Sequence, residues 1–380
     1  MPTATRAAVL RHVGAARPYA DSRPLGVETV TLDDPGPGEV LVAVKAAGLC
    51  HSDLSVINGD RPRPLPMALG HEAAGVVEAL GEGVADLAVG DHVVMVFMPS
   101  CGHCSPCAEG RPALCEPGAV ANGRGELLTG RRALHAGAET LNHHLGCSAF
   151  AERAVVSRRS LVKIDADLSF EHAALFGCAV LTGVGAVVNT AGVRAGQSAV
   201  VVGLGGVGLA AVLGALASGA SPVVAVDLSE DKLALARSLG PAPGVVQTVN
   251  AADPDAVDQV RALTRGGSDF VFEMAGSVRA LDSAWRMTRR GGTTVTAGLP
   301  PPEAALAVNV VSLVGEERTL KGSYIGTCVP VRDIPRYVAL FRQGRLPVDR
   351  LLSGTLALDD INAAFDALAD GRAVRQVIRF

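Results

Sequence analysis

Aromatic residues are scarce in this 380-residue sequence, which holds one Trp, three Tyr and nine Phe. A strong charge of either sign is missing as well, because 34 Lys and Arg residues stand against 38 Asp and Glu residues, for a formal net charge of -4. A protein with this balance has no overall basic field that would attract phosphate backbones or anionic lipids. We therefore expect neither nucleic acid nor a membrane among its partners.

Uninterrupted apolar stretches are missing too. Arg6, Arg11 and His12 interrupt the N-terminal region before an apolar core of signal-peptide length forms, so we expect no secretion and a cytoplasmic location. The apolar run 199–217 is long enough to raise the question of a transmembrane helix, but five glycines divide it. In the reducing cytosol, the eight cysteines are more readily metal ligands or free thiols than disulfides.

The length of the chain exceeds the size at which one hydrophobic core usually keeps growing, which predicts two domains. In the first region, residues 29–189, short β-branched runs alternate with Gly, Pro and Asp. This pattern predicts short strands and loops. Residues 116–146 show no sustained period, and we interpret them as a long surface loop with a function.

The pattern becomes that of an α/β domain after residue 196. Four apolar runs predict the strands of a doubly wound parallel sheet: 198–203, 221–227, 269–273 and 292–298. A Gly/Ala/Leu-rich helix is expected between the first two runs, and amphipathic helices at 230–240 and 279–288. Two more amphipathic helices, at 331–346 and 359–371, are predicted near the end of the sequence.

Four cysteines form the run C-x2-C-x2-C-x7-C, namely Cys101, Cys104, Cys107 and Cys115. At this spacing four thiolates can surround one zinc ion tetrahedrally. An iron–sulfur cluster and four unrelated thiols are the two other interpretations. A site closed by four thiolates leaves no position for substrate, so we expect it to stabilise the fold, with catalysis elsewhere.

Three further motifs offer a second set of metal ligands: GLCHSD at 48–53, GHEAAG at 70–75 and GCAVLTG at 177–183. Cys50, His71 and Cys178 would supply two thiolates and one imidazole, which suits zinc and leaves a fourth position open. Each motif alone is weak, since a lone cysteine is usually a small core residue.

The sequence gives no support for a further metal site beside these two. The HExxH motif of metallopeptidases is absent, because Gly75 stands where its second histidine would fall. Cys147 and Cys328 have no neighbouring ligand residues in the sequence, and we interpret them as core or surface thiols.

A glycine-rich turn follows the first apolar run of the α/β region. Gly203, Gly205 and Gly208 form G-x-G-x-x-G between a predicted strand and a predicted helix, where backbone amides can bind a pyrophosphate. Asp227 ends the next predicted strand, where a carboxylate binds both ribose hydroxyls and repels a 2'-phosphate, so NAD is favoured over NADP. Lys232 either reaches the same ribose or is a solvated helix lysine.

Together these motifs resemble the zinc-containing medium-chain alcohol dehydrogenases, of the class I/III-like branch, over nearly the whole chain and in the family's order. The resemblance implies a mainly β, GroES-like catalytic domain formed by 1–179 and 325–380. It implies a Rossmann dinucleotide-binding domain, a doubly wound parallel sheet, formed by 180–324. The expected activity is reversible transfer of hydride from a primary or secondary alcohol to NAD, giving an aldehyde or ketone.

The resemblance also assigns roles around the metals, with two zinc ions per chain, one catalytic and one structural. Cys50, His71 and Cys178 would bind the catalytic zinc, with Glu72 as a nearby carboxylate that coordinates transiently. Asp53 would orient His71. The structural zinc would belong to the cysteine run, Cys101, Cys104, Cys107 and Cys115.

The remaining roles concern substrate and coenzyme. Ser52 matches the hydroxyl that receives the substrate proton, and Phe97 should line the substrate pocket. His51 and Arg375 would face the coenzyme pyrophosphate, and Thr182 would lie against the nicotinamide. The resemblance also implies that the turn Gly203, Gly205, Gly206, Val207 and Gly208 binds the coenzyme, together with Asp227 and Lys232.

Two features qualify the resemblance. Many members carry a histidine three residues after the Ser/Thr that receives the proton, whereas this chain has Ser55, so the outer end of the proton relay is undefined. The 116–146 segment looks like the extended loop of the dimeric branch, which implies a homodimer. Two other functions stay open: a dehydrogenase of thiol–aldehyde adducts of the glutathione-dependent formaldehyde type, and a non-catalytic zinc- or nucleotide-binding protein.

Overall fold

The structure is a computed structural model that describes residues 2–380. The chain forms two compact units. Unit 1 consists of the chain up to Cys178 together with Val329–Pro335 and Leu352–Phe380. Unit 2 consists of Ala179–Cys328 and Arg336–Leu351.

A closed barrel forms one part of unit 1, in the strand order β1-β2-β7-β8-β4. Its strands are β1 (Thr3–Leu10), β2 (Leu25–Leu32), β4 (Met67–Ala68), β7 (Leu134–Ala136) and β8 (Glu139–His143). Alternate residues of β1 and β2 point inward, because side chains of a strand face its two sides in turn. Ala7, Val9, Val30 and Leu32 belong to the core of the barrel for this reason.

A seven-stranded sheet forms the other part of unit 1, in the order β10-β6-β5-β3-β18-β17, with β9 paired to β3. Its strands are β3 (Glu39–Gly48), β5 (Ala73–Leu80), β6 (His92–Met95), β9 (Arg153–Ser157), β10 (Leu161–Ile164), β17 (Gly354–Leu356) and β18 (Gln376–Arg379). β3 is the apolar run EVLVAVKAAG and is buried along almost its whole length. It pairs with β5, β9 and β18 and so lies at the centre of the sheet.

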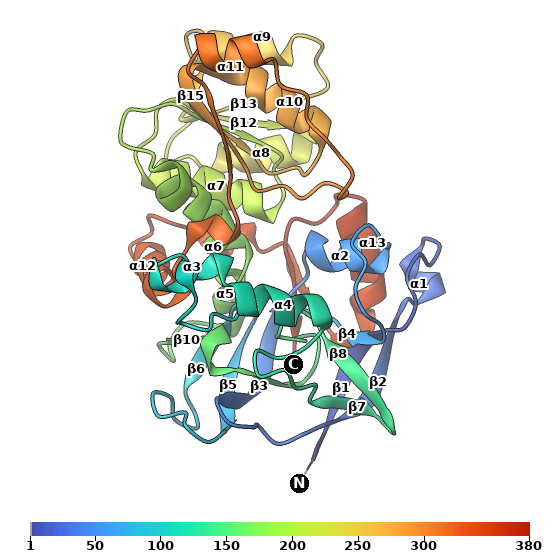
Figure 1. Ribbon diagram of the computed structural model, residues 1–380. Helices are drawn as coiled ribbons and strands as arrows, with labels where there is room; N and C mark the ends of the chain where they lie inside the picture. The colour runs from blue at the N-terminus through green and yellow to red at the C-terminus, as the bar shows by residue number, and fades with distance from the viewer. Residues whose placement is uncertain (1) are drawn as a thin grey trace. The chain divides into compact units, whose positions relative to one another are not determined.

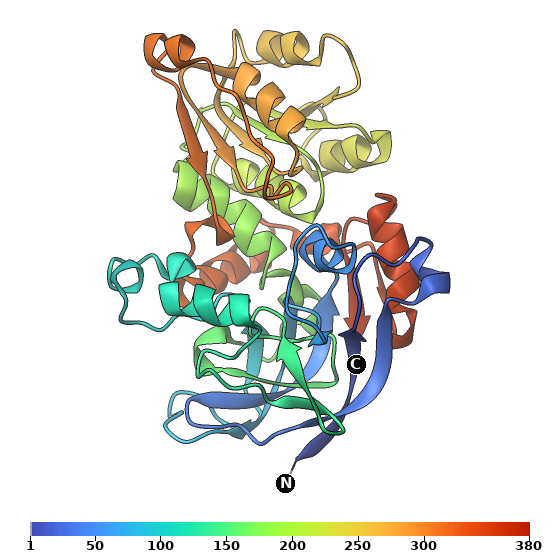
Figure 2. The same ribbon diagram turned by 45° about the vertical axis from the view of Figure 1, so that its right-hand side comes forward.

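The prediction of a long surface loop at 116–146 is wrong. The segment contains α4 (Glu116–Arg124) and the hairpin of β7 and β8, which closes the barrel against β2 and β4. In Figure 2 this green hairpin lies beside the blue strands of the barrel. Strands of three and five residues are too short to show a period, and the Gly signals mark turns: Gly125 ends α4 at a positive φ of 67°.

Short helices connect the strands of unit 1: α1 (Tyr19–Ser22), α2 (His51–Ile57), α3 (Ser105–Ala108), α5 (Phe170–Leu175) and α13 (Ile361–Ala369). Single 3-10 turns add η1 (Pro112–Leu114), η2 (Arg158–Ser160) and η6 (Leu358–Asp360). Both amphipathic helices predicted for the end of the chain are present, as α12 (Pro330–Arg342) and α13.

A six-stranded parallel sheet forms the centre of unit 2, in the order β13-β12-β11-β14-β15-β16. Its strands are β11 (Ala199–Val202), β12 (Val223–Asp227), β13 (Val246–Asn250), β14 (Ser268–Glu273), β15 (Thr288–Thr296) and β16 (Thr319–Gly322). The helices between them are α7 (Gly206–Ala217), α8 (Glu230–Leu239), α9 (Ala256–Leu263), α10 (Val278–Met287) and α11 (Val310–Gly315). The predicted doubly wound sheet is confirmed.

Figure 1 shows α9 and α10 on one side of this sheet, with α7 and α8 on the other. Val200, Val202, Val224 and Val226 pack on the α9 and α10 side, where they meet Ala284 and other buried residues of those helices. Both faces of the sheet are therefore covered, which explains why its strands read as continuous apolar runs.

Two details of unit 2 differ from the sequence-based expectation. Residues 179–191 belong to α6 (Ala179–Gly185) and a π-helical turn, η3 (Ala186–Ala191), rather than to the region of short strands. Arg336–Leu351 packs with unit 2, although the predicted division had placed it in the catalytic domain. Its apolar side chains Leu346, Val348 and Leu351 are buried there, the last two in η5 (Val348–Leu351). A 3-10 turn, η4 (Ile325–Thr327), completes the unit.

No helix within residues 2–380 combines the length and the apolar character needed to cross a bilayer.

Candidate metal and coenzyme sites

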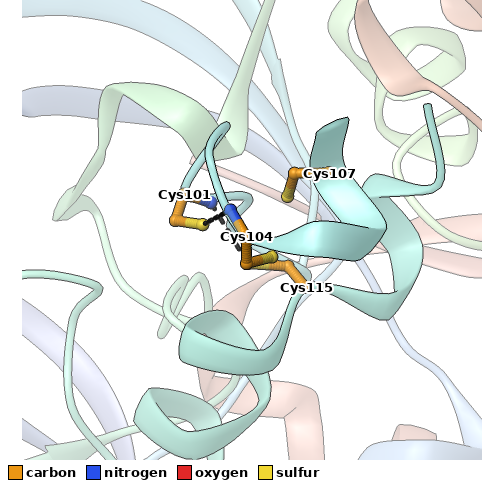
Figure 3. A group of neighbouring side chains, drawn as sticks. All are labelled: Cys101, Cys104, Cys107 and Cys115. Carbon is orange, nitrogen blue, oxygen red and sulfur yellow. Dashed lines mark hydrogen bonds between the residues drawn. The ribbon is translucent and has the colours of Figure 1, made fainter. Parts of the chain in front are cut away.

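The four cysteines of the C-x2-C-x2-C-x7-C run converge in space, and we call them the four-cysteine lobe. Cys104 precedes α3, Cys107 lies within α3, and Cys115 precedes α4, while Cys101 lies in the loop after β6. Figure 3 shows the side chains around a common centre, and their four sulfurs lie within 4.8 Å of one another. Backbone amides donate to two of these sulfurs, from Cys104 to Cys101 at 3.3 Å and from Cys101 to Cys115 at 3.1 Å.

The pKa values of the lobe diverge because the thiols are so close. Burial raises the pKa of Cys107 to about 12, and the neighbouring sulfurs of Cys104 and Cys115 add to the rise. Burial opposes ionisation of Cys101 as well, but the backbone amides of His103 and Cys104 lower its pKa to about 6. Four thiolates at this spacing need a cation to balance their charge, and a tetrathiolate set is a closed zinc site.

A second cluster lies in unit 1 and brings together three residues from separate motifs. Cys50 caps α2, His71 lies between β4 and β5, and Cys178 follows α5. Their two sulfurs and a ring nitrogen of His71 lie within 4.8 Å of one another, and all three residues are buried. We call this group the Cys50–His71–Cys178 cluster.

Local structure holds these ligands in place. Gly70 has a φ of 95°, and a Cβ atom there would collide with the backbone nitrogen of Phe150, so only glycine fits before His71. At the start of α2, the Asp53 carboxylate accepts a hydrogen bond from the backbone amide of Cys50 at 3.2 Å. This capping interaction fixes the orientation of Cys50.

The imidazole of His71 is held by Asp53. His71 Nδ1 lies 3.0 Å from Asp53 Oδ1, and both side chains are fully buried. Burial lowers the pKa of His71, but the Asp53 carboxylate and Cys50 outweigh it, and the pKa lies well above its usual range. An ionised carboxylate only accepts, so Nδ1 must carry a proton, which leaves Nε2 as the nitrogen available to a metal.

Hydrogen bonding among residues 2–380 supports this assignment, because the buried His71 Nε2 has no hydrogen-bond partner. A buried polar atom without a partner is costly unless a ligand occupies its lone pair. Two thiolates and one imidazole are a donor set that zinc prefers, with a fourth position left for substrate or water. The residues therefore fit a catalytic zinc ion.

Arg375 directly precedes β18, and its side chain lies beside the Cys50–His71–Cys178 cluster. Its guanidinium lies 3.2 Å from a carboxylate oxygen of Glu72 and donates to the backbone oxygen of Leu49 at 2.7 Å. Arg375 is 3% exposed and Glu72 is fully buried. The thiol of Cys178 and the charge of Arg375 both help to lower the pKa of Cys50 well below its usual range. No contact of Arg375 tests its predicted role at the coenzyme pyrophosphate.

The glycine turn of unit 2 has the geometry of a dinucleotide site. Gly203 follows β11 at a φ of 91°, and Gly205 precedes α7. A Cβ atom at Gly208 would collide with the backbone oxygen of Gly203, whereas one at Gly205 would meet nothing within 4 Å. Gly203 and Gly208 thus allow close packing of strand and helix, and Gly205 leaves open space for a phosphate.

Asp227 lies at the end of β12, beside that turn. Its carboxylate accepts from the backbone amide of Leu204 at 2.6 Å and from that of Ser229 at 3.0 Å. These two bonds orient the carboxylate at the edge of the sheet where a ribose would lie. Lys232 lies one turn into α8 and is half-buried, with its backbone amide near Ser229.

Other predicted site residues take the following places. Ser52 is half-buried and His51 is exposed in the first turn of α2, while Thr182 is half-buried in α6. The ring of Phe97 stands edge-on to His71, with ring centres 5.2 Å apart, so it does lie beside a metal ligand. Cys147 and Cys328 are both buried, as core thiols are.

One residue of the site escaped sequence reasoning. His144 is 1% exposed and its Nδ1 lies 3.2 Å from Asp53 Oδ1, on the carboxylate that holds His71. The dipeptide at His143 and His144 was visible in the sequence, but it fell in the segment interpreted as a surface loop. Nothing in the spacing connects it to Asp53.

The chain is similar to known dehydrogenases. A family model for the alcohol dehydrogenase GroES-like domain matches residues 36–166, and one for zinc-binding dehydrogenases matches 206–343. The chain is 40% identical to "Putative alcohol dehydrogenase D" of Mycobacterium tuberculosis over 98% of this chain and 99% of that protein. It is 36% identical to an S-(hydroxymethyl)glutathione dehydrogenase of Escherichia coli, over 96% and 99%.

The fold also matches solved structures. Benzyl alcohol dehydrogenase of Acinetobacter calcoaceticus superposes with a TM-score of 0.92 at 33% identity, over 100% of this chain and 99% of that one. A structure from Sinorhizobium meliloti 1021 holds NADP and matches with a TM-score of 0.77 at 27% identity, over 100% of both chains.

The chain belongs to the zinc-binding alcohol dehydrogenases of the medium-chain dehydrogenase/reductase superfamily. It is an oxidoreductase of CH–OH groups that uses zinc and a nicotinamide coenzyme. Membership in this family favours zinc over an iron–sulfur cluster in the four-cysteine lobe.

Proposed function

We propose that the protein is an NAD-linked alcohol dehydrogenase with two zinc ions per chain, which oxidises a primary or secondary alcohol to an aldehyde or ketone. The observation that carries the proposal is the Cys50–His71–Cys178 cluster, where two sulfurs and an imidazole nitrogen lie buried within 4.8 Å of one another. These three ligands would leave the fourth position of a tetrahedral zinc ion to the substrate. The four-cysteine lobe supplies the second, closed site. A zinc ion in the open site supplies Lewis acidity, which lowers the pKa of an alcohol hydroxyl.

The protein's own residues then have separate tasks. Cys50, His71 and Cys178 hold the metal, and Asp53 keeps the Nδ1 proton of His71 in place. Ser52, beside the ligand Cys50 at the start of α2, takes the proton of the substrate hydroxyl. Ser55 does not extend this relay outward, because its hydroxyl donates to the backbone oxygen of His51 at 2.9 Å.

Replacing the metal ligands tests this proposal. Cys50→Ala or His71→Ala should abolish alcohol oxidation, while binding of NAD to the turn after β11 survives. Zinc content measured on the purified protein should fall from two ions per chain to one in each variant. Unchanged turnover in either variant would remove the zinc assignment.

The coenzyme preference is tested at Asp227. Its carboxylate would accept from both ribose hydroxyls and repel a 2'-phosphate, so NAD should be preferred. Asp227→Ala should shift the ratio of kcat/KM for NAD over NADP by about tenfold or more, since each 1.4 kcal/mol of lost discrimination is a factor of ten. An unchanged ratio would place coenzyme selection in other residues.

A second candidate function is oxidation of a thiol–aldehyde adduct. It is favoured by the similarity to the E. coli S-(hydroxymethyl)glutathione dehydrogenase and to an alcohol dehydrogenase class-3 of Drosophila melanogaster, each 36% identical. Rates of NADH formation from formaldehyde with and without glutathione separate the two candidates. A panel of primary, secondary, aromatic and branched alcohols then ranks substrates, and no turnover with any of them would favour the non-catalytic alternative.

The cytoplasmic location and the homodimer stay proposals. Exposed apolar side chains on α11 support self-association: Val310, Val311 and Val314 are 68%, 82% and 71% exposed. β16, at the edge of the unit 2 sheet, is exposed along its length and presents an unpaired strand edge.

A further inference from the structure

Residues 144–150 wrap around the segment that carries His71. The backbone amides of Ala149 and Phe150 donate to the oxygens of Gly70 and Leu69, both at 3.0 Å. The turn before them is tight, because the amides of Cys147 and Ser148 both donate to the oxygen of His144. The backbone of His144 is therefore held in place beside the segment that carries His71.

The ring of His144 completes the surroundings of the Asp53 carboxylate. Oδ1 of Asp53 receives His71 Nδ1 at 3.0 Å, His144 Nδ1 at 3.2 Å and the backbone amide of Gly70 at 3.3 Å, while Oδ2 receives the amide of Cys50. The His144 contact lacks the geometry of a hydrogen bond, and Nδ1 has no hydrogen-bond partner among residues 2–380. Three donors that share one oxygen cannot all approach it in line.

The protonation of His144 follows from this geometry. A lone pair on Nδ1 would face an ionised carboxylate 3.2 Å away in a buried setting, which is strongly unfavourable. Nδ1 must therefore carry a proton. Burial lowers the pKa of His144, and the Asp53 carboxylate opposes this change.

We propose that His144 is a positioning residue for the catalytic zinc: its ring stands edge-on to the ring of His71 and contacts the same Asp53 oxygen, so it restrains that carboxylate and keeps His71 Nε2 aimed at the metal. The inference rests on the proposed zinc site of Cys50, His71 and Cys178. Outer-shell partners of metal-binding histidines typically contribute 10–100-fold to metal affinity. His144 lies one contact further from the metal than Asp53, and we expect it to contribute about tenfold to zinc affinity.

The neighbouring residue provides a matched control. His143 is as buried as His144, at 1% exposure, and it lies on the same segment. Its Nε2 accepts a hydrogen bond from the backbone amide of Ala133 at 2.9 Å, whereas His144 contacts Asp53. His143→Leu and His144→Leu thus remove the same kind of ring from neighbouring positions. Only His144→Leu removes a contact with the Asp53 carboxylate.

The experiment measures zinc release from the intact holoprotein to a chromophoric chelator. His144→Leu should accelerate release from the catalytic site about tenfold and leave release from the four-cysteine lobe unchanged. His143→Leu should leave both phases at the wild-type rate. His144→Asn, whose amide keeps a donor near the position of Nδ1, should restore slow release. Release does not depend on turnover, so the result is read separately from that of the activity assays.

A second measurement needs no variant that alters folding. In the native protein labelled with 15N-histidine, the ring nitrogens of His144 should report a proton on Nδ1, with the signals assigned by their loss in His144→Asn. Protonation at Nε2 instead would overturn the proposal. So would equal zinc release from His144→Leu and the wild type, equal acceleration by His143→Leu, or a third zinc ion per chain, which would make Asp53, His71 and His144 metal ligands themselves.

Discussion

Arg375 and Glu72 form a buried ion pair beside the Cys50–His71–Cys178 cluster. Removing one partner of such a pair is costly, because the remaining charge stays buried without compensation. Arg375→Leu should lower the free energy of unfolding by about 3–5 kcal/mol. Adding Glu72→Gln in the same chain should recover part of that loss, as measured by denaturant unfolding at a fixed zinc concentration.

A partly exposed ion pair in the same unit serves as the control. Arg153 and Glu78 lie 2.8 Å apart, with side chains 36% and 33% exposed. Arg153→Leu should change stability by about 0–1 kcal/mol, the range for surface pairs. If Arg153→Leu and Arg375→Leu lowered the free energy of unfolding equally, the Arg375–Glu72 pair would stabilise the protein no more than a surface pair does.

At the scale of single residues, the sequence predicted residues that belong to motifs but not residues that come together only in the folded protein. Cys50, His71 and Cys178 could be predicted because each belongs to a short pattern of residue types with known metal chemistry. His144 lies in no such pattern, and its partner Asp53 is far away in the sequence. The ion pair of Arg375 with Glu72 was missed for the same reason, since β18 brings the chain's last residues beside β3 only in the folded protein.

At the scale of secondary-structure elements, the turn between β11 and α7 separates two uses of glycine. Gly208→Ala places a Cβ atom against the oxygen of Gly203 and should destabilise unit 2 by about 1–3 kcal/mol, the usual cost of overpacking. Gly205 has a φ of -72° and open space around it, so Gly205→Ala should change stability by less than about 0.5 kcal/mol.

Coenzyme binding should show a different pattern from stability. Gly205→Ala should weaken NAD binding, because the added methyl group occupies the space through which a pyrophosphate approaches the backbone amides. Thermal unfolding and NAD titration of both variants check these expectations. If Gly205→Ala bound NAD as the wild type does, the pyrophosphate would have to lie elsewhere.

Element prediction succeeded where elements are long and failed where they are short. The parallel strands of unit 2 are buried on both faces and separated by helices, which gives the clear apolar runs from which they were predicted. β7 and β8 have three and five residues, and their pairing with β2 and β4 comes from closure of the barrel. Tertiary structure decides such strands, so the sequence of 116–146 looked like a loop.

At the scale of the whole molecule, the exposed valines of α11 bear on assembly. If they lie in a homodimer interface, Val311→Asp should convert the dimer to a monomer, because it would bury a charge without a partner. Light scattering coupled to size-exclusion chromatography gives the mass directly. Val89→Asp is the control, since Val89 is 66% exposed in unit 1 and should leave the mass unchanged. A monomeric wild type would contradict the proposed dimer.

The division of unit 1 between the two ends of the chain affects the order of events during synthesis. A ribosome produces all of Ala179–Cys328 before it produces β18, which pairs with both β3 and β17. Domains generally fold as they emerge, starting from the N-terminal side. Residues 46–48 of the nascent β3 therefore lack their β18 partner, and Glu72 lacks Arg375, until the ribosome has made residues 375–379. All of unit 2 can therefore fold before the surroundings of the Cys50–His71–Cys178 cluster are complete.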